Sequence, residues 1–220
     1  MQEIRAVFCK SGSAKYVSHL DLNRIMCRAV RRAGVPIWYT EGFNPHPFFT
    51  FALPLSLGCN SIYETMDFKI TEDMPFDEIK NRFNPCLPEG IVITDVCSPK
   101  MKHTLIAFAK YQIEIRSEKV SAEELFKLWE EFVSQPAIMV SKKTKSKAVR
   151  EFDIKETIKN ITTSLDGERV LVEIILPAGC TDNVNPALLT GVFLENYCDV
   201  APEFEMTRTA VYTSEMKTFI

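Results

Sequence analysis

The sequence predicts an α+β protein made of two tandem ferredoxin-like units that pack together, each in the order strand–helix–strand–strand–helix–strand. Two observations lead to this class. Apolar residues alternate with period two in some segments and recur with helical period in others, so strands and helices interleave along the chain. The same order occurs twice, in residues 1–100 and 101–220, and no linker rich in proline, glycine or serine separates the halves.

The first half opens with a strand and an amphipathic helix. In residues 3–9 the apolar side chains of Ile4, Ala6 and Phe8 recur at every second position and so share one side, as in a strand with one buried face. A helix follows and ends at Gly34, ahead of Pro36. Its apolar side chains share one face: Leu22, Ile25, Met26, Ala29, Val30 and Ala33.

Two strands, a helix and a final strand complete the first half. Alternation predicts strands over residues 49–57 and 62–70, with a turn at Gly58 between them. A short helix is expected to begin at Pro75, and a last strand to span residues 91–96.

The second half repeats this order, beginning with a strand over residues 106–116. Ser121 and Glu124 form a capping box, the pairing that satisfies free backbone groups at a helix start. The apolar face of that helix consists of Leu125, Leu128, Trp129, Phe132 and Val133.

The rest of the second half is expected to contain a hairpin, a helix and a strand. Asp166-Gly167 is typical of a two-residue hairpin turn. Residues 152–165, which precede it, fit a helix as well as a strand, so the first arm of the hairpin stays open. Asn185-Pro186 favours a helix start, and residues 205–213 a closing strand.

Composition is typical of a globular cytoplasmic protein that does not span a membrane. The chain is 46% hydrophobic with a net charge of −3, and no apolar run approaches the roughly 20 residues that span a bilayer. The first residues do not resemble a secretory signal. Seven cysteines, never spaced as C-x-x-C, indicate reduced thiols rather than a zinc or iron–sulfur site. We therefore expect neither a metal nor a cofactor.

Two basic segments are candidate sites for RNA or another anion. The first helix carries Arg24, Arg28, Arg31 and Arg32 away from its apolar face, without interleaved acids. Guanidinium groups in such a row can bind phosphate in a bidentate manner. The second segment carries Lys142, Lys143, Lys145 and Lys147 without aromatic neighbours, so it would contact backbone charge rather than bases. The alternative is a solvated helix face and a flexible surface loop.

A candidate pocket surrounds the segment between residues 39 and 47, which is too rich in glycine and proline to continue a helix and is dense in hydrogen-bonding groups. His19 and His46 are candidate acid–base residues. The other pocket residues are Ser18, Asp21, Glu41, Gly42, Phe43, Asn44 and Glu64. For Asp21 the alternative is a helix cap with Ser18, and for Glu64 an exposed strand end.

Four ordered motifs together resemble a bacterial family associated with radical-SAM enzymes, domain of unknown function 2344. They are residues 16–22 (YVSHLDL), 28–36 (RAVRRAGVP), 41–47 (EGFNPHP) and 51–58 (FALPLSLG). The resemblance covers the whole chain, loosely in the second half. It implies a radical-SAM partner enzyme with a cobalamin-binding domain, and a role in RNA or translation. Phe48 stands where the family commonly has lysine, which removes one positive charge.

These observations favour an accessory protein that binds structured RNA, tRNA or rRNA, for such a partner enzyme. The chain has no C-x-x-x-C-x-x-C motif, so we do not expect it to hold the radical-SAM cluster itself. One alternative is an RNA-cleaving or RNA-modifying enzyme that uses His19 or His46 as acid–base group. Another is a scaffold that contacts only protein. The oligomeric state stays open.

Overall fold

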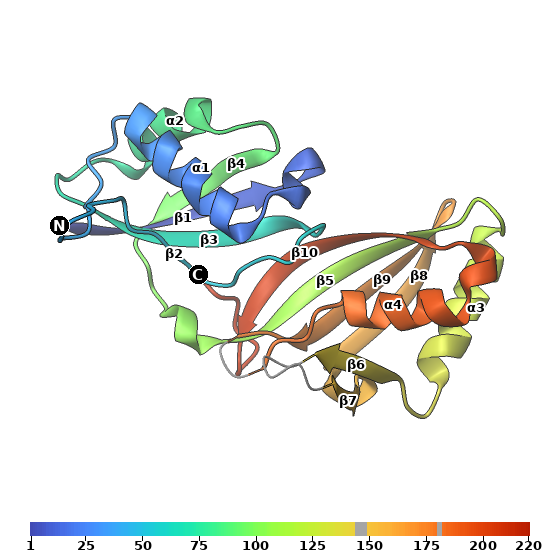
Figure 1. Ribbon diagram of the computed structural model, residues 1–220. Coiled ribbons are helices and arrows are strands. Elements are labelled where there is room, and N and C mark those ends of the chain that lie inside the picture. The colour runs from blue at the N-terminus through green and yellow to red at the C-terminus, as the bar shows by residue number, and fades with distance from the viewer. Residues whose placement is uncertain (144–148, 180–181) are drawn as a thin grey trace. The chain divides into compact units, whose positions relative to one another are not determined.

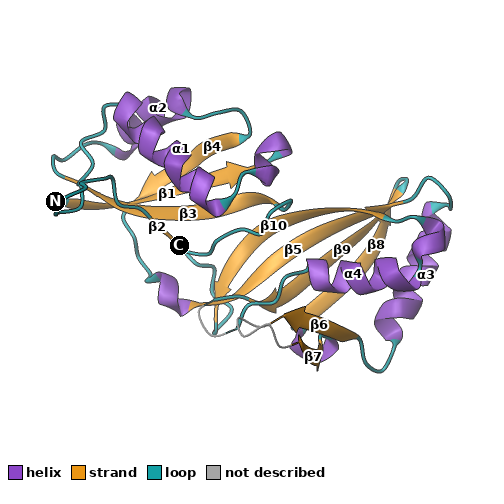
Figure 2. Cartoon of the chain, viewed as in Figure 1, coloured by secondary structure: helices purple, strands orange, loops and turns teal. Residues whose placement is uncertain are grey.

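The computed structural model describes residues 1–143, 149–179 and 182–220, and its chain divides into two compact units. The first unit comprises residues 1–106 and 217–220, and the second residues 107–216. Helices and strands interleave in both (Figures 1 and 2), which confirms the predicted mixed α+β class.

The first unit is a sheet in the spatial order β4–β1–β3–β2, with helices α1 and α2 over one face (Figure 1). Strand β1 runs antiparallel to both β3 and β4, and the short β2 adds to the edge at β3. The bounds are β1 (Gln2–Lys10), α1 (His19–Arg32), β2 (Thr50–Phe51), β3 (Asn60–Ile70), α2 (Phe76–Phe83) and β4 (Ile91–Cys97).

The core of the first unit lies between the helices and the sheet. Met26, Ala29 and Val30 of α1 are fully buried, against strand residues such as Phe8 and Met66. Burying one large apolar side chain contributes about 1.5–3 kcal/mol, so this face fixes α1 on the sheet and leaves its opposite face in solvent. The predicted helix is confirmed, and the left-handed Gly34 (φ 62°) follows its last turn.

The prediction of a strand over residues 49–57 is wrong beyond Phe51. One further bond, from the Ala52 N–H to the Thr65 carbonyl (3.1 Å), follows the strand before the chain bends away. Pro54 explains this ending, because it has no N–H to donate to a strand ladder. Leu57 is 65% exposed, so its alternate spacing does not reflect a buried face.

The second unit contains a sheet in the order β10–β5–β9–β8, covered by helices α3 and α4. Strand β9 runs antiparallel to its neighbours β5 and β8. Trp129 and Phe193 bring the two helices together, with ring centroids 5.0 Å apart. The bounds are β5 (Ile106–Arg116), α3 (Ala122–Ser134), β8 (Asn160–Asp166), β9 (Arg169–Pro177), α4 (Ala187–Asn196) and β10 (Glu203–Thr213).

An additional hairpin, β6 (Met139–Lys143) with β7 (Val149–Asp153), lies between α3 and β8. The sequence analysis did not predict β6, nor the part of β7 that precedes residue 152. Residues 152–165, which fitted either a helix or a strand, are the end of β7, one 3₁₀ turn over Lys155–Thr157, and β8. The arm of the hairpin before Asp166-Gly167 is thus a strand.

Candidate functional site

The loop between residues 39 and 47, called here the EGFNPHP loop, is a closed turn with internal hydrogen bonds. Tyr39 and Pro47 pair across its base as an antiparallel bridge. The Thr40 N–H donates to the His46 carbonyl at 3.0 Å, and the His46 N–H donates to Thr40 Oγ1 at 3.2 Å. Gly42 adopts φ 116°, a backbone region that favours glycine. These contacts fix the shape of the loop.

The His46 ring takes part in this internal bonding. Its Nδ1 lies 2.9 Å from the Asn44 carbonyl oxygen and 3.2 Å from Thr40 Oγ1. Because the carbonyl only accepts, Nδ1 carries the proton in this contact, and Nε2 is the nitrogen left as an acceptor. The His46 ring therefore contributes to the shape of the turn. Phe43, at 112% relative exposure, projects fully into solvent.

Helix α1 borders the EGFNPHP loop. The Arg31 guanidinium lies 5.7 Å from the centroid of the Tyr39 ring, within the range of a cation–π contact. The Cys27 thiol lies 3.8 Å from the Pro47 carbonyl oxygen. Burial raises the pKa of that thiol, although Arg31 opposes the effect. The C-terminal half of α1 and the loop therefore form one continuous surface.

The four predicted arginines differ in whether they form ion pairs or hydrogen bonds with other residues of the chain. Arg24 Nη1 lies 2.9 Å from Asp21 Oδ1 in an exposed ion pair, and Arg32 donates to the Cys86 carbonyl. Arg28 and Arg31 are exposed, and neither forms an ion pair with any described residue. Arg28 and Arg31 are therefore the pair most available to an external anion.

The start of α1 fits the capping alternative for Asp21. The Ser18 hydroxyl accepts from the Asp21 N–H at 3.1 Å and donates to Asp21 Oδ2 at 2.7 Å. The Ser18 hydrogen bond, and then the Arg24 hydrogen bond, lower the pKa of Asp21 below its ordinary 3.8. The His19 ring packs edge-on against Phe51, at 5.1 Å between centroids. Within the described part of the chain, no hydrogen bond joins His19 to His46.

Glu64 lies inside the first unit rather than at an exposed strand end. It sits on β3 opposite Phe8 and is 6% exposed.

The lysine-rich segment lies largely beyond what the structure describes. The backbones of Lys142 and Lys143 belong to β6. Lys145 and Lys147 lie outside the described residues.

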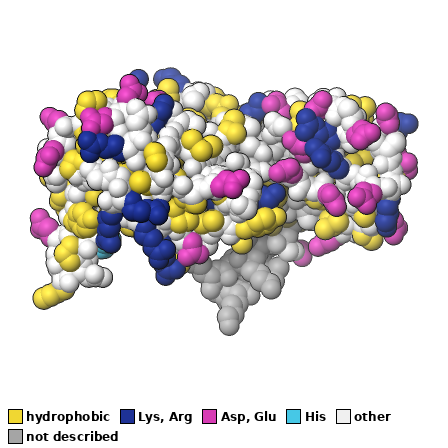
Figure 3. All heavy atoms as spheres, turned by 90° about the horizontal axis from the view of Figure 1, so that it is seen from above, with side chains coloured by type: hydrophobic (Ala, Val, Ile, Leu, Met, Phe, Trp, Pro, Cys, Tyr) yellow, Lys and Arg dark blue, Asp and Glu magenta, His cyan; other side chains and the backbone are white. Residues whose placement is uncertain are grey.

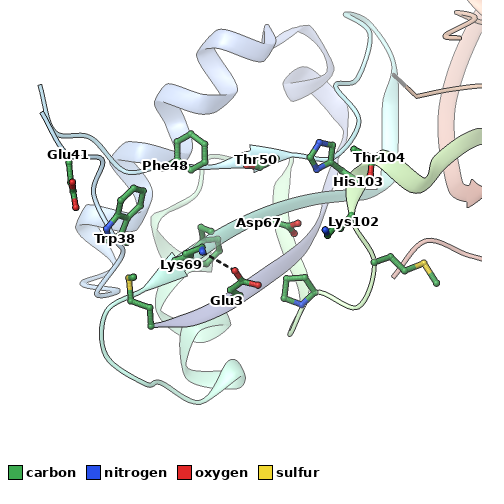
Figure 4. Close-up of a pocket in the computed structure, with 14 residues that line it drawn as sticks. Glu3, Trp38, Glu41, Phe48, Thr50, Asp67, Lys69, Lys102, His103 and Thr104 are labelled. Carbon is green, nitrogen blue, oxygen red and sulfur yellow. Dashed lines mark ion pairs between the residues drawn. The ribbon is translucent and has the colours of Figure 1, made fainter. Parts of the chain in front are cut away.

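The EGFNPHP loop and its flanks also border a cavity of about 590 Å³ in the first unit (Figure 4). Trp38 and Phe48, on either side of the loop, line it with their rings perpendicular and their centroids 6.4 Å apart. Glu41, predicted as a pocket residue, lines it as well. The remaining lining residues are Met1, Glu3, Thr50, Asp67, Phe68, Lys69, Pro99, Met101, Lys102, His103 and Thr104.

Cross-strand ion pairs between β1 and β3 form the charged side of this cavity. The Lys69 ammonium lies 2.9 Å from Glu3, and Arg5 donates two hydrogen bonds of 2.7 Å to Asp67. Arg5 is fully buried and also donates to the Met101 carbonyl at 2.8 Å. That bond holds residues 99–104 against the sheet, so they form part of the cavity lining.

Sequence reasoning missed most of the cavity residues. Trp38 and Phe48 carry a usable signal, because each flanks the loop that the sequence singled out. Lys69 and Asp67 carry none without the strand register that places them opposite Glu3 and Arg5. His103, on the lining, was not among the predicted site residues.

The described residues contain no group of histidine, cysteine and carboxylate side chains arranged to hold a metal ion. Their helices are also too short or too polar to cross a bilayer.

Comparison with known proteins gives one family and distant structural similarities. Residues 3–186 match the family described as "Uncharacterized protein conserved in bacteria (DUF2344)". No curated protein sequence gives a significant match.

Among solved structures, a Cbf5–Nop10–Gar1 complex shares 11% identity over 94% of this chain, with a TM-score of 0.48. The match spans 48% of that structure's chain, so the present chain covers about half of its length. A protein of unknown function from Galdieria sulphuraria shares 9% identity over 94% of this chain and 98% of its own, with a TM-score of 0.26.

Proposed function

We propose, since this chain belongs to the bacterial family DUF2344, that it is an accessory protein which binds structured RNA for a cobalamin-dependent radical-SAM enzyme. The observation that carries the RNA part is the surface shared by α1 and the EGFNPHP loop. There, two exposed arginines without ion-pair partners among the described residues, Arg28 and Arg31, accompany the fully exposed ring of Phe43. Arginines bind phosphate and exposed aromatic rings stack on unpaired bases, so this combination suits RNA.

The positive charge of this surface comes from a few arginines and not from an overall positive charge of the protein. The whole chain has a net charge of −3, and Figure 3 shows acidic and basic side chains interspersed over the displayed face. Affinity for RNA would therefore depend on a few positions rather than on a general positive field. The lysines at 142, 143, 145 and 147 belong to the proposal as a second contact with the RNA backbone.

The fold proposed for each unit is ferredoxin-like. In the first unit the strands lie in the order β4–β1–β3–β2, and in the second, apart from the β6–β7 hairpin, in the order β10–β5–β9–β8. Counted along the chain within each unit, both orders read fourth, first, third, second. This repeated order supports two tandem ferredoxin-like units, an architecture that RNA-binding proteins often use.

The observed contacts do not favour the enzymatic alternative. His19 packs against Phe51, and no described residue is hydrogen-bonded to His46 Nε2, the nitrogen that lies outside the bonds of the loop. Neither ring is hydrogen-bonded to a carboxylate among the described residues, as a general base oriented by an acid would be.

RNA binding can be tested by fluorescence anisotropy with labelled tRNA and an rRNA fragment at about 50 and 200 mM salt. We expect affinity to fall steeply with salt, by a factor that grows with each phosphate contact. Replacing Arg28 and Arg31 by alanine should lower the slope of log K against log salt by roughly 1.4 to 1.8.

The matched control is Lys119→Ala with Lys127→Ala, which removes the same charge from exposed positions of the second unit. An equal decrease of the salt-dependence slope in both double variants would contradict the proposed surface. Binding whose affinity does not change with salt concentration would contradict it as well.

The partner enzyme is a separate test. Affinity-tagged chain should co-purify with a protein that carries a corrinoid and an iron–sulfur cluster, both visible by absorbance. Recovery of RNA without such a protein would remove the radical-SAM part and leave the RNA-binding part.

A further inference from the structure

We infer that the cavity beside the EGFNPHP loop binds a single unstacked nucleotide, with the base against Trp38 and the phosphate at Lys102. The inference rests on the proposed function, because structured RNA is the source of nucleotides that it would supply. It gives the cavity a role distinct from that of Arg28 and Arg31, which would contact the RNA backbone outside it.

The size and lining of the cavity fit a nucleotide. Its volume of about 590 Å³ lies within the range of roughly 300–1,000 Å³ typical of small-ligand sites. Most of the surface area of the lining is apolar, and Met101 contributes to it. Figure 4 shows the rings of Trp38 and Phe48 at the cavity. The rings of Trp38 and Phe48 are at 80° to each other, so they do not stack and a ring face stays available to a base.

Polar groups in the cavity match the edge of a base. Glu41 is exposed, lies on the same side of the cavity as Trp38 (Figure 4), and has no ion-pair partner among the described residues. A free carboxylate accepts hydrogen bonds from the exocyclic amino groups of adenine, guanine and cytosine, and uracil has none. We therefore expect amino-bearing bases to be preferred.

The opposite side of the cavity offers a cation for the phosphate. Figure 4 shows Lys102, His103 and Thr104 together, across the cavity from Trp38. Lys102 is exposed and forms no ion pair within the described part of the chain. Between the two sides, the charges of Glu3 and Lys69 are paired, as are those of Asp67 and Arg5. The intervening surface thus carries little net charge to repel a phosphate.

Trp38 makes the inference directly measurable. The chain has two tryptophans, and the other, Trp129, is fully buried in the second unit. Titration with adenosine, AMP, CMP, UMP and a short oligoribonucleotide should quench Trp38 fluorescence to saturation, and Trp38→Phe should abolish the response. Glu41→Gln should raise the Kd for AMP and CMP about tenfold, with little change for UMP.

Lys102→Ala should raise the Kd for AMP about tenfold without affecting adenosine. The matched controls are Glu72→Gln, an exposed carboxylate of the same unit outside the cavity, and Lys127→Ala in the second unit. Neither control should change any Kd. A control that weakens binding as much as its cavity counterpart would overturn the assignment.

Comparing the oligoribonucleotide with AMP shows whether the cavity binds a nucleotide of RNA or a free nucleotide. Tighter quenching by the oligoribonucleotide assigns the site to RNA, whereas equal or tighter quenching by AMP assigns it to a free nucleotide. If neither the oligoribonucleotide nor AMP quenches Trp38 fluorescence, the inference is overturned. If salt-dependent RNA binding persists without quenching, the cavity assignment fails alone. If mononucleotides quench and no RNA is retained, the proposed function fails and the cavity remains a nucleotide site.

Discussion

Arg5 holds together the face of the first sheet that lies away from its helices. Its side chain is 1% exposed, donates twice to Asp67, and lies 4.4 Å from the Phe219 ring centroid. Replacing Arg5 by methionine should destabilise the protein by about 2–3 kcal/mol, since Asp67 loses its partner but stays 24% exposed and partly hydrated. Urea unfolding measures this change.

The control is Lys69→Met, which removes a pair whose side chains are 49% and 63% exposed. Exposed pairs contribute about 0–1 kcal/mol, so a similar loss in both variants would show that burial of Arg5 does not matter.

At the residue scale the structure also predicts a pH dependence for Asp21. Its pKa is lowered in the folded protein by the Ser18 and Arg24 hydrogen bonds. Its stabilising effect is therefore present above the ordinary value of 3.8 and is lost as pH falls through the lower folded pKa. NMR titration should show a higher Asp21 pKa in Ser18→Ala, and a smaller rise in Arg24→Ala. An unchanged pKa in Ser18→Ala would contradict the capping geometry.

At the scale of elements, the EGFNPHP loop owes its shape to Thr40. Thr40→Val removes the hydroxyl that accepts the His46 N–H, so the amide of His46 should exchange faster with solvent. Hydrogen exchange followed by NMR measures this, with the exposed Thr162→Val on β8 as the matched substitution. Unchanged exchange at His46 would mean that the backbone bridge alone holds the loop.

The elements also show what the sequence could predict. Local signals were sufficient for α1 and α3, because Ser18 and Ser121 accept the capping hydrogen bonds that their spacing indicated. The strand that alternating apolar residues predicted is absent from residues 52–57. A period of two does not reveal whether a segment has a partner strand, and Pro54 cannot donate a hydrogen bond to one.

The candidate site likewise contains residues that the sequence could identify and residues that it could not. The arginines and the loop follow from residue types in order along the chain, so the sequence identified them. The cavity depends on pairs such as Glu3 with Lys69, which are 66 positions apart and meet only through the register of β1 and β3. The register of two strands so far apart along the chain is not evident from a single sequence.

At the scale of the whole molecule, a net charge of −3 means that RNA binding must be concentrated in particular places. The central claim is that one such place is the surface formed by α1 and the EGFNPHP loop. Ultraviolet cross-linking to bound RNA, with the modified peptides identified by mass spectrometry, tests it most directly. We predict adducts at Tyr39 and Phe43 of the loop. Adducts confined to residues 107–216, or none on a protein that retains RNA, would contradict it.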